Sequence, residues 1–229
     1  MGWIVPWSGG KDSTATIIVM LEKGLPIDKI IHVRMMSTET LPATHKVMTD
    51  FVDDCIARFS SMGLRVEMKK SLPFDVLANK VTLRSKYPDR IGKPKGFTEC
   101  ARGMCSFQKE KTKLTGGSNN DNTMLGICYD EPERMRSGRH SVLFDNRITQ
   151  RMAYDICKSK GMLSPLYELG VKRDGCFFCP NVSKKEIRLL NANQIELIKK
   201  WVSMTPPGAY LQDDWRKHID DYLLQLSLF

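Results

Sequence analysis

Near its start the chain runs from a short apolar segment into a glycine turn and then into a helical pattern. The apolar segment is WIVPW (residues 3–7), the turn is SGGKDS (residues 8–13), and apolar residues recur at helical spacing over 13–23. Free backbone N–H groups and the helix dipole attract anions at such a junction, and glycines let the backbone adopt positive φ angles. The stretch therefore predicts a turn that binds a phosphate group.

Two common phosphate-binding motifs do not fit this turn. The Walker motif is G-x-x-x-x-G-K followed by Ser or Thr; aligned on Gly10 and Lys11, it needs glycine where the chain has Val5, and Ser or Thr where it has Asp12. The dinucleotide motif G-x-G-x-x-G fails because Gly9 and Gly10 are adjacent and no third glycine follows. The turn therefore belongs to a different kind of phosphate site.

Apolar runs and helical patterns alternate over the first third of the chain. The runs at 3–7, 29–36 and 64–68 are typical of buried strands, and the patterns at 13–23 and 43–62 are typical of helices. A β-α-β-α-β order favours a parallel, doubly wound α/β sheet. Ligands of such sheets bind beyond the carboxyl ends of the strands, where the glycine turn lies.

The rest of the chain is less regular. Residues 71–121 contain prolines, glycines, many basic residues and two cysteines, and they predict an insertion with some helix. A further strand is predicted at 123–130, a helix at 148–161, and one or two helices over 183–204. We expect a nucleotide-binding α/β domain over 1–180, which carries the cysteine-containing insertion, and a helical C-terminal extension over 181–229.

Charge and apolar content narrow the partners and the location. The 229 residues carry a net charge of +9, from 35 basic and 26 acidic residues. This charge suits a polyanionic partner such as a nucleotide or nucleic acid, and an ordinary basic surface is an equal alternative. No apolar stretch approaches the ~18 residues of a membrane span, and no secretory signal is visible. We therefore expect a cytoplasmic protein without a membrane partner.

The turn resembles the pyrophosphate-binding PP-loop, S-G-G-x-D-S, at every fixed position. Three later segments are similar to the branch of that superfamily that resembles phosphoadenosine-phosphosulfate (PAPS) reductases. They are STETLPATHKVMTDFV (37–52), GICYDEPER (126–134) and LSPLYELGVKRDGCFFCP (163–180). The resemblance covers about residues 4–180. It implies a sheet of the adenine nucleotide alpha-hydrolase-like type and a nucleotide substrate, either ATP or PAPS.

The resemblance assigns roles to residues of two segments. The nucleotide-binding residues that it implies are Ser8, Gly9, Gly10, Lys11, Asp12 and Ser13, together with Asp130 and Glu131. Lys11, Asp12 and Arg134 are the expected catalytic residues. Arg134 can clamp a phosphate or sulfate, and Asp12, Asp130 or Glu131 can help to hold Mg²⁺. A solvated charged loop is the alternative for the segment around Arg134.

Four of the seven cysteines form two close pairs. Cys176 and Cys179 form C-x-x-C, and Cys100 and Cys105 form C-x-x-x-x-C within the insertion. Two thiolate pairs can hold zinc or an iron–sulfur cluster, and PP-loop sulfur-transfer enzymes that resemble this chain often carry an iron–sulfur cluster. Unliganded thiols, or a redox pair at 176 and 179, are the alternative. We expect the two phenylalanines of the C-x-x-C loop to be exposed, which a metal-anchored loop would explain.

The other three cysteines are separate in the sequence. Cys55 and Cys157 lie within helical patterns beside apolar residues, so we expect them to be buried as small apolar side chains. Cys128 follows the predicted strand and stands next to the YDEPER segment. For Cys128 a buried role and a role in the site are both open.

Together these features predict an ATP-using PP-loop enzyme that cleaves ATP at the α-phosphate, adenylylates an acceptor and serves sulfur transfer or nucleic-acid modification. A nucleic acid as acceptor and a sulfur-donor protein are the further partners considered. One alternative is a PAPS-binding sulfonucleotide reductase, which the lack of a cysteine after Cys179 argues against. The other is a non-catalytic module that binds a nucleotide or nucleic acid.

Overall fold

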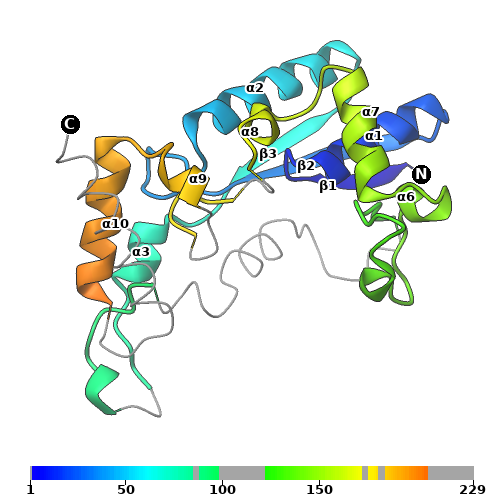
Figure 1. Ribbon diagram of the computed structural model, residues 1–229. Helices are drawn as coiled ribbons and strands as arrows, with labels where there is room; N and C mark the ends of the chain where they lie inside the picture. Colours follow the sequence, from blue (N-terminus) through cyan, green and yellow to red (C-terminus); the bar gives the residue numbers. More distant parts are fainter. Residues whose placement is uncertain (1, 85–87, 98–121, 172–174, 180–183, 206–229) are drawn as a thin grey trace. The chain divides into compact units, whose positions relative to one another are not determined.

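The computed structural model describes residues 2–84, 88–97, 122–171, 175–179 and 184–205 (Figure 1). The chain divides into two compact units. Unit 1 consists of Met1–Arg34, Lys46–Lys70 and Glu110–Asp174, and unit 2 consists of Met35–His45, Ser71–Lys109 and Gly175–Phe229. The domain boundary that the sequence places after residue 180 stays a prediction.

Unit 1 is built on a parallel three-stranded sheet in the order β1-β2-β3. The strands are β1 (Trp3–Trp7), β2 (Ile27–Arg34) and β3 (Val66–Lys70), and both neighbouring pairs are parallel. The consecutive residues Ile30 and Ile31 of β2 are both buried, so both faces of the sheet are covered at this strand. The predicted parallel α/β sheet is confirmed.

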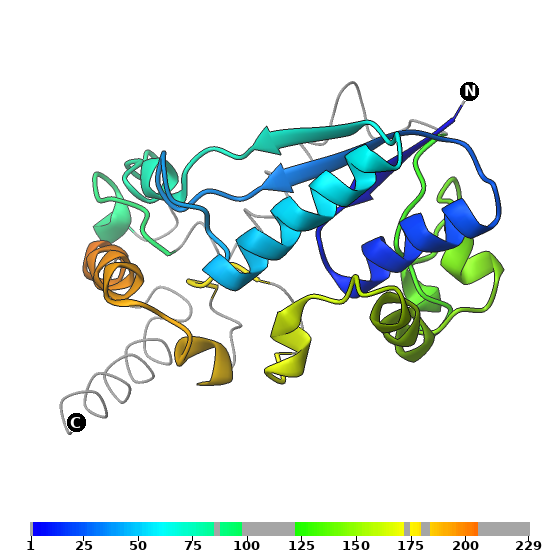
Figure 2. The ribbon, with the colours of Figure 1, turned by 90° about the horizontal axis from the view of Figure 1, so that it is seen from above.

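Helices α1 (Lys11–Glu22) and α2 (Lys46–Ser61) make the crossovers between neighbouring strands (Figure 2). The buried residues of α2 recur at helical spacing; they are Met48, Val52, Cys55 and Phe59. Each helix ends before a glycine with positive φ, Gly24 at 65° and Gly63 at 78°. These glycines stop the helices because other residues adopt this conformation only at a cost.

The chain crosses to the other edge of β1 when it returns to the sheet. Thr123 forms a parallel bridge with Ile4, and the Met124 N–H donates to the Ile4 carbonyl at 2.9 Å. β1 therefore has neighbours on both edges, and the order of the strands reverses at its carboxyl end. This is the point where doubly wound sheets bind their ligands, and the glycine turn begins there.

The strand predicted at 123–130 is wrong beyond its first two residues. Thr123 and Met124 form single bridges, the second with His140, and the chain then leaves the sheet. Its backbone instead packs on α1. A Cβ on Gly126 would lie 2.9 Å from the Ser13 nitrogen and 3.0 Å from the Asp12 carbonyl carbon, so only glycine fits there.

The 3-10 helix η2 (Pro132–Arg134) and three further α-helices complete the described part of unit 1, and each of the three α-helices begins with a side-chain cap. They are α6 (Val142–Asp145), α7 (Gln150–Ser159) and α8 (Pro165–Glu168), capped by Ser141, Thr149 and Ser164. The hydroxyl of each cap accepts from a backbone N–H of the first turn, which satisfies a donor that the helix leaves open. The helix predicted at 148–161 is confirmed as α7, which packs against α1.

Unit 2 has a core of aromatic side chains. Its described helices are α3 (Phe74–Ala78), η1 (Pro88–Arg90), α9 (Lys184–Ile187) and α10 (Ala192–Met204). The aromatic core consists of Phe74, Phe97, Phe177, Phe178 and Trp201. Phe74 stacks on Phe178 at 4.5 Å and meets the edge of Trp201 at 4.8 Å, geometries that aromatic pairs favour.

Two sequence predictions in unit 2 have different outcomes. The pattern at 183–204 forms two helices, α9 and α10, and a capping box of Asn191 and Gln194 separates them. The predicted exposure of the C-x-x-C phenylalanines is wrong, because Phe177 and Phe178 are 1% and 2% exposed. Apolar packing therefore explains these two residues. No helix among the described residues is both long and apolar enough to cross a membrane.

Replacing Gly126 with alanine is expected to destabilise the protein by about 1–3 kcal/mol, because the backbone of α1 cannot move away from the added methyl group. Gly175→Ala is the matched control, since a Cβ there meets nothing closer than 3.9 Å. Chemical denaturation followed by circular dichroism measures both variants. Equal stability of Gly126→Ala and the unsubstituted protein would show that the two backbones are not in close contact.

Candidate nucleotide-binding site

The glycine turn has the backbone that a close anion site needs. Gly9 has a φ of 85°, which strains other residue types. A Cβ at this position would also lie 2.4 Å from the Met48 methyl carbon and 2.9 Å from a methyl of Val52. Gly10 is the N-cap of α1 and has extended backbone angles. The sequence prediction that this turn uses the freedom of glycine is confirmed at Gly9.

The two serines of the motif close the turn on itself. The hydroxyl oxygens of Ser8 and Ser13 are 3.1 Å apart, and the Ser8 N–H donates to the Ser13 hydroxyl at 3.2 Å. The Gly10 N–H donates to the Ser8 hydroxyl at 3.3 Å, and the Ser13 hydroxyl donates to the Gly10 carbonyl at 3.0 Å. Ser8 is exposed while Ser13 is buried. The turn is therefore held in shape by its own hydroxyls.

Lys11 and Asp12 form an ion pair at the start of α1. The Lys11 ammonium lies 2.6 Å from the Asp12 Oδ1, and it also donates to the Gln150 side-chain oxygen at 3.3 Å. The side chains are 14% and 27% exposed, so water has limited access to the pair. The backbone N–H of Lys11 donates to the Tyr167 hydroxyl at 3.3 Å.

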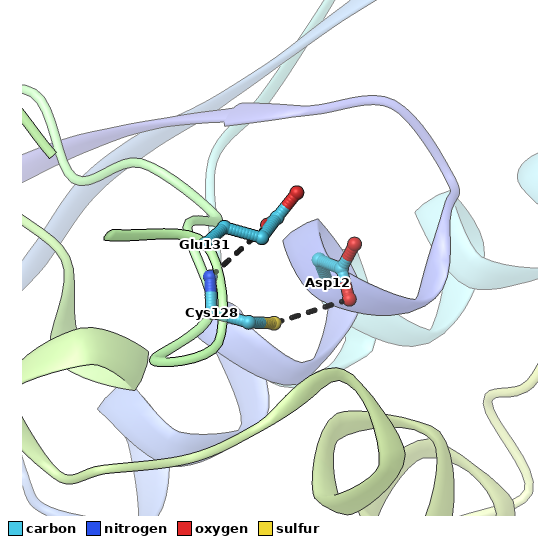
Figure 3. Close-up of side chains that lie close together, drawn as sticks. All are labelled: Asp12, Cys128 and Glu131. Atoms are coloured by element: carbon cyan, nitrogen blue, oxygen red, sulfur yellow. Dashed lines mark hydrogen bonds between the residues drawn. The ribbon is translucent and has the colours of Figure 1, made fainter. Parts of the chain in front are cut away.

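Asp12 meets two side chains from the segment that follows Gly126 (Figure 3). Ligand atoms of Asp12, Cys128 and Glu131 all lie within 4.8 Å of one another. The Cys128 thiol donates to the Asp12 Oδ1 at 3.3 Å, and the Cys128 N–H donates to a Glu131 carboxylate oxygen at 3.4 Å. Two segments that are more than a hundred residues apart in the sequence thus form one cluster with two carboxylates.

The environment of Cys128 keeps its thiol protonated. Burial raises its pKa well above the ordinary thiol value, and the negative charge of Asp12 raises the pKa further. Cys157, in α7, contacts the start of α1 and donates its S–H to the Lys11 carbonyl at 3.2 Å. Burial, with a smaller effect of Asp12, raises the pKa of Cys157 to about 12. Cys128 therefore acts in this site as a hydrogen-bond donor rather than as a thiolate nucleophile.

Arg134 pairs with the Glu131 of the cluster, while Asp130 faces the start of α7. One Arg134 nitrogen lies 2.8 Å from each Glu131 carboxylate oxygen, and the Arg134 side chain is 48% exposed. The Asp130 Oδ1 accepts from the Gln150 N–H at 3.0 Å, at the start of α7. Arg134 is thus at the exposed edge of the site, and Asp130 caps a helix and is not part of the three-residue cluster.

Some residues of the site carry no signal in the sequence. Tyr167, Gln150 and Cys157 touch the start of α1 from α8 and α7, and nothing in their local sequence indicates this contact. Gly126 does have a signal, because it is the first residue of the GICYDEPER segment. Cys128 follows two residues later, and its closeness to that segment is the reason that a role in the site stayed open.

The C-x-x-C loop is fixed by its backbone and its aromatic residues. The Phe177 N–H donates to the Ala43 carbonyl at 2.8 Å, and the Cys179 N–H donates to the Cys176 carbonyl at 2.8 Å. Cys176 and Cys179 are half-buried. Cys100 and Cys105 lie outside the described residues, so the four-cysteine metal site stays a prediction.

Comparison with known proteins gives little similarity. No protein-family model matches the chain, and no curated protein matches it. Among solved structures, the chain is similar to the U34-tRNA thiolase NcsA from Methanococcus maripaludis with its 4Fe–4S cluster, at 12% identity and a TM-score of 0.38. The similarity covers 86% of this chain and 69% of the thiolase. Values this low establish neither a shared family nor a shared activity.

The thiols of Cys128 and Cys157, which contact Asp12 and Lys11, are expected to resist alkylation in the folded protein. At pH 8 about one Cys157 in ten thousand is ionised with its pKa at about 12, against about a quarter of unfolded cysteines. Iodoacetamide treatment followed by peptide mass mapping should leave Cys128 and Cys157 unmodified, and guanidinium should make both reactive. Rapid modification of native Cys128 would show that it is a thiolate and would contradict its role as a donor to Asp12.

Proposed function

We propose that this chain is an ATP-using enzyme of the PP-loop class that cleaves the α–β bond of ATP and adenylylates an acceptor. One observation carries the proposal. The start of α1, with Lys11 and Asp12, and the segment around Glu131 come together at the carboxyl end of β1. Phosphate-binding and metal-binding groups therefore share one site at the reversal point of the sheet.

The turn supports the pyrophosphate end of the nucleotide. Backbone N–H groups at the start of α1 and the helix dipole attract negative charge. The Ser8 hydroxyl is exposed at the turn and adds a donor, and the Lys11 ammonium adds a full charge. The turn matches S-G-G-x-D-S and lacks the residues of the Walker motif. In this proposal it therefore binds the β- and γ-phosphates, which leave together as pyrophosphate.

The carboxylates suit a magnesium ion that accompanies a triphosphate. Mg²⁺ prefers oxygen ligands and usually binds to one or two carboxylates, water and substrate phosphates. Asp12 and Glu131 offer two such carboxylates within one cluster. Cys128 does not suit Mg²⁺, because its sulfur is a soft ligand and its thiol stays protonated. A bound Mg²⁺ would shield the charge of the phosphates, and Asp12 and Glu131 are the residues that would hold it.

Each charged group of the site has a partner that a magnesium nucleotide can replace. Lys11 is paired with Asp12, and Glu131 is paired with Arg134. When a cation binds between the two carboxylates, Lys11 and Arg134 lose part of their attraction to them. Both cations then become available for phosphate oxygens, so nucleotide and metal are expected to bind together.

The chemistry follows from positioning and charge. An oxygen of the acceptor attacks the α-phosphorus, the bond to the oxygen that bridges to the β-phosphate breaks, and pyrophosphate leaves with the electron pair. Lys11 and the first turn of α1 stabilise the charge that develops on the leaving pyrophosphate, and Arg134 stabilises the reacting phosphate. The product is an acceptor that carries AMP as a good leaving group.

Sulfur transfer extends this proposal to the cysteines. A sulfur nucleophile would displace AMP from the activated acceptor. A zinc ion or an iron–sulfur cluster needs three or four ligands, and the described residues supply the pair Cys176 and Cys179. This pair fits such a group only together with Cys105, as a third ligand, or with both Cys100 and Cys105, so anaerobic purification with metal analysis is the direct test of this part.

Lys11→Ala is expected to weaken binding of α,β-methylene-ATP and of free pyrophosphate by about 10- to 150-fold, because a charge-assisted hydrogen bond contributes about 1.5–3 kcal/mol. Isothermal titration calorimetry with Mg²⁺ present measures both ligands. Lys23→Ala is the matched control, since Lys23 is an exposed lysine at the other end of the same helix. The same titration with PAPS separates ATP use from sulfonucleotide binding.

Two results would contradict the nucleotide proposal. One is unchanged binding of both ligands by Lys11→Ala. The other is turnover of ATP that yields ADP and phosphate in place of AMP and pyrophosphate, measured by chromatography of ATP labelled at the α-phosphate.

Asp12→Asn and Glu131→Gln are each expected to weaken Mn²⁺ binding by at least about tenfold in the presence of α,β-methylene-ATP, because each removes a carboxylate ligand. Electron paramagnetic resonance of free Mn²⁺ measures the binding. Asp130→Asn is the matched control, since an asparagine oxygen still accepts from the Gln150 N–H. Loss of Mn²⁺ binding in the Asp130 variant alone would contradict Asp12 and Glu131 as the metal ligands and would assign the metal to Asp130.

A further inference from the structure

We propose that a two-stranded ribbon of unit 2 binds the phosphate backbone of a nucleic acid. The basic ribbon consists of residues 80–84 and 90–95, whose parts 80–82 and 92–95 pair antiparallel around a bridge between Val81 and Pro94. The Thr82 N–H donates to the Lys93 carbonyl at 2.9 Å, and the Lys95 N–H donates to the Lys80 carbonyl at 3.0 Å. In Figure 1 the ribbon extends below α3.

The pairing of the strands gives the ribbon two different faces. Side chains alternate along a strand, so in the paired segment Lys80 and Thr82 share one face while Val81 lies on the other. The pairing of Val81 with Pro94 sets Lys95 opposite Lys80 and Lys93 opposite Thr82. One face of the paired segment therefore carries Lys80, Lys93 and Lys95, and the opposite face carries Val81 and Pro94.

The base of the ribbon is fixed to the aromatic core. The Gly96 N–H donates to the Ala78 carbonyl at 2.9 Å, and a Cβ on Gly96 would lie 2.8 Å from the Thr205 Cα. Phe97 follows at once, is 5% exposed, and donates its N–H to the Thr205 hydroxyl at 2.9 Å. A ribbon anchored in this way presents its charges on a fixed base, so they need little ordering when they bind.

The charges of the basic ribbon are concentrated and open to solvent. The described residues 79–84 and 88–97 include five basic residues and one acidic residue, Asp89. Their net charge is therefore +4, within a chain whose total net charge is +9. Lys80, Arg84 and Lys93 are exposed, and none of them takes part in an ion pair between described residues.

Other exposed basic residues lie in a different setting. Lys46, Arg151 and Lys199 each pair with a carboxylate on the same helix, at 2.6, 3.2 and 2.7 Å. Their positive charge is therefore partly neutralised by a neighbour. Among the residues that the structure describes, no carboxylate pairs with Lys80, Arg84 or Lys93, so their charge is available to attract a polyanion.

The arrangement of the two faces favours a nucleic acid over a membrane. A bilayer surface binds when apolar side chains and basic side chains reach it from the same side. By strand alternation Val81 lies on the face opposite Lys80, Lys93 and Lys95, so a flat surface cannot contact this apolar side chain and the three lysines together. Lys93 and Lys95 are two residues apart, about 6.7 Å along a strand, and Lys80 lies opposite Lys95, so several cations can contact neighbouring phosphates of one nucleic-acid backbone.

This inference identifies the acceptor as a nucleic acid. Only the role of that nucleic acid as the adenylylated acceptor rests on the proposed function. The bound nucleic acid would supply the oxygen that becomes adenylylated. Binding is measured without ATP, so the failure of one proposal is distinguishable from the failure of the other. A chain that bound nucleic acid without cleaving ATP would keep the basic ribbon as a docking surface and remove the enzymatic role.

The experiment measures binding of the full chain to fluorescein-labelled single-stranded and duplex RNA and DNA 20-mers between 50 and 300 mM salt. The triple variant Lys80→Gln, Arg84→Gln, Lys93→Gln is compared with the triple variant Lys46→Gln, Arg151→Gln, Lys199→Gln. Both lower the net charge by the same three units. Lys80→Arg with Lys93→Arg keeps the charge, and thermal unfolding confirms that every variant folds.

The slope of log affinity against log salt is negative, and in the ribbon variant its magnitude is expected to fall by about two to three. Each lost phosphate contact removes about 0.7–0.9 from that magnitude. The control triple should bind within twofold of the unsubstituted chain, and the arginine variant should retain binding. Equal losses of nucleic-acid affinity in the two triple variants would overturn the proposal, because they would show an effect of total charge and not of the basic ribbon. Retained binding in the ribbon variant, or binding only to anionic phosphatidylserine vesicles, would overturn it as well.

Discussion

The candidate site depends on the close packing of the Gly126 backbone against the first turn of α1. A side chain at this position would meet the backbone at Ser13 at 2.9 Å, so the two segments approach as closely as backbones can. This contact brings Cys128 and Glu131 to Asp12.

The charges of the site are arranged in pairs that hold one another in place. Asp12 receives the Lys11 ammonium and the Cys128 thiol on the same oxygen, and Glu131 receives Arg134. Pairs that are partly buried cost more to break than pairs in water. The side chains are therefore held near their working positions before a ligand arrives, and a ligand must offer both a cation for the carboxylates and an anion for Lys11.

Unit 2 shows a second use of packing to position a functional segment. The C-x-x-C loop has its two phenylalanines in the aromatic core and a backbone hydrogen bond to Ala43. These contacts hold the loop against the described part of unit 2. The same core fixes the base of the basic ribbon through Phe97 and Thr205, so one cluster of aromatic rings orients two segments with different chemistry.

Local sequence was sufficient for the elements with strong periodic patterns. The strand at 3–7 matches β1, the pattern at 43–62 contains α2, and the pattern at 148–161 contains α7. The predicted strands at 29–36 and 64–68 each differ from β2 and β3 by two residues at both ends, where periodicity is weakest. The strand at 123–130 was wrong, because Gly126 packs on α1 and not in the sheet.

By itself, the sequence determined the parallel α/β class, a turn that uses a glycine at positive φ, and the concentration of positive charge in the insertion. These follow from hydrophobic periodicity, from backbone sterics and from composition, all of which are local. Only the tertiary structure decided that Glu131 and Cys128 meet Asp12 while Asp130 caps α7, and that Phe177 and Phe178 are buried. Such outcomes depend on contacts between segments far apart in the chain, and no local pattern encodes which side chain will face which partner.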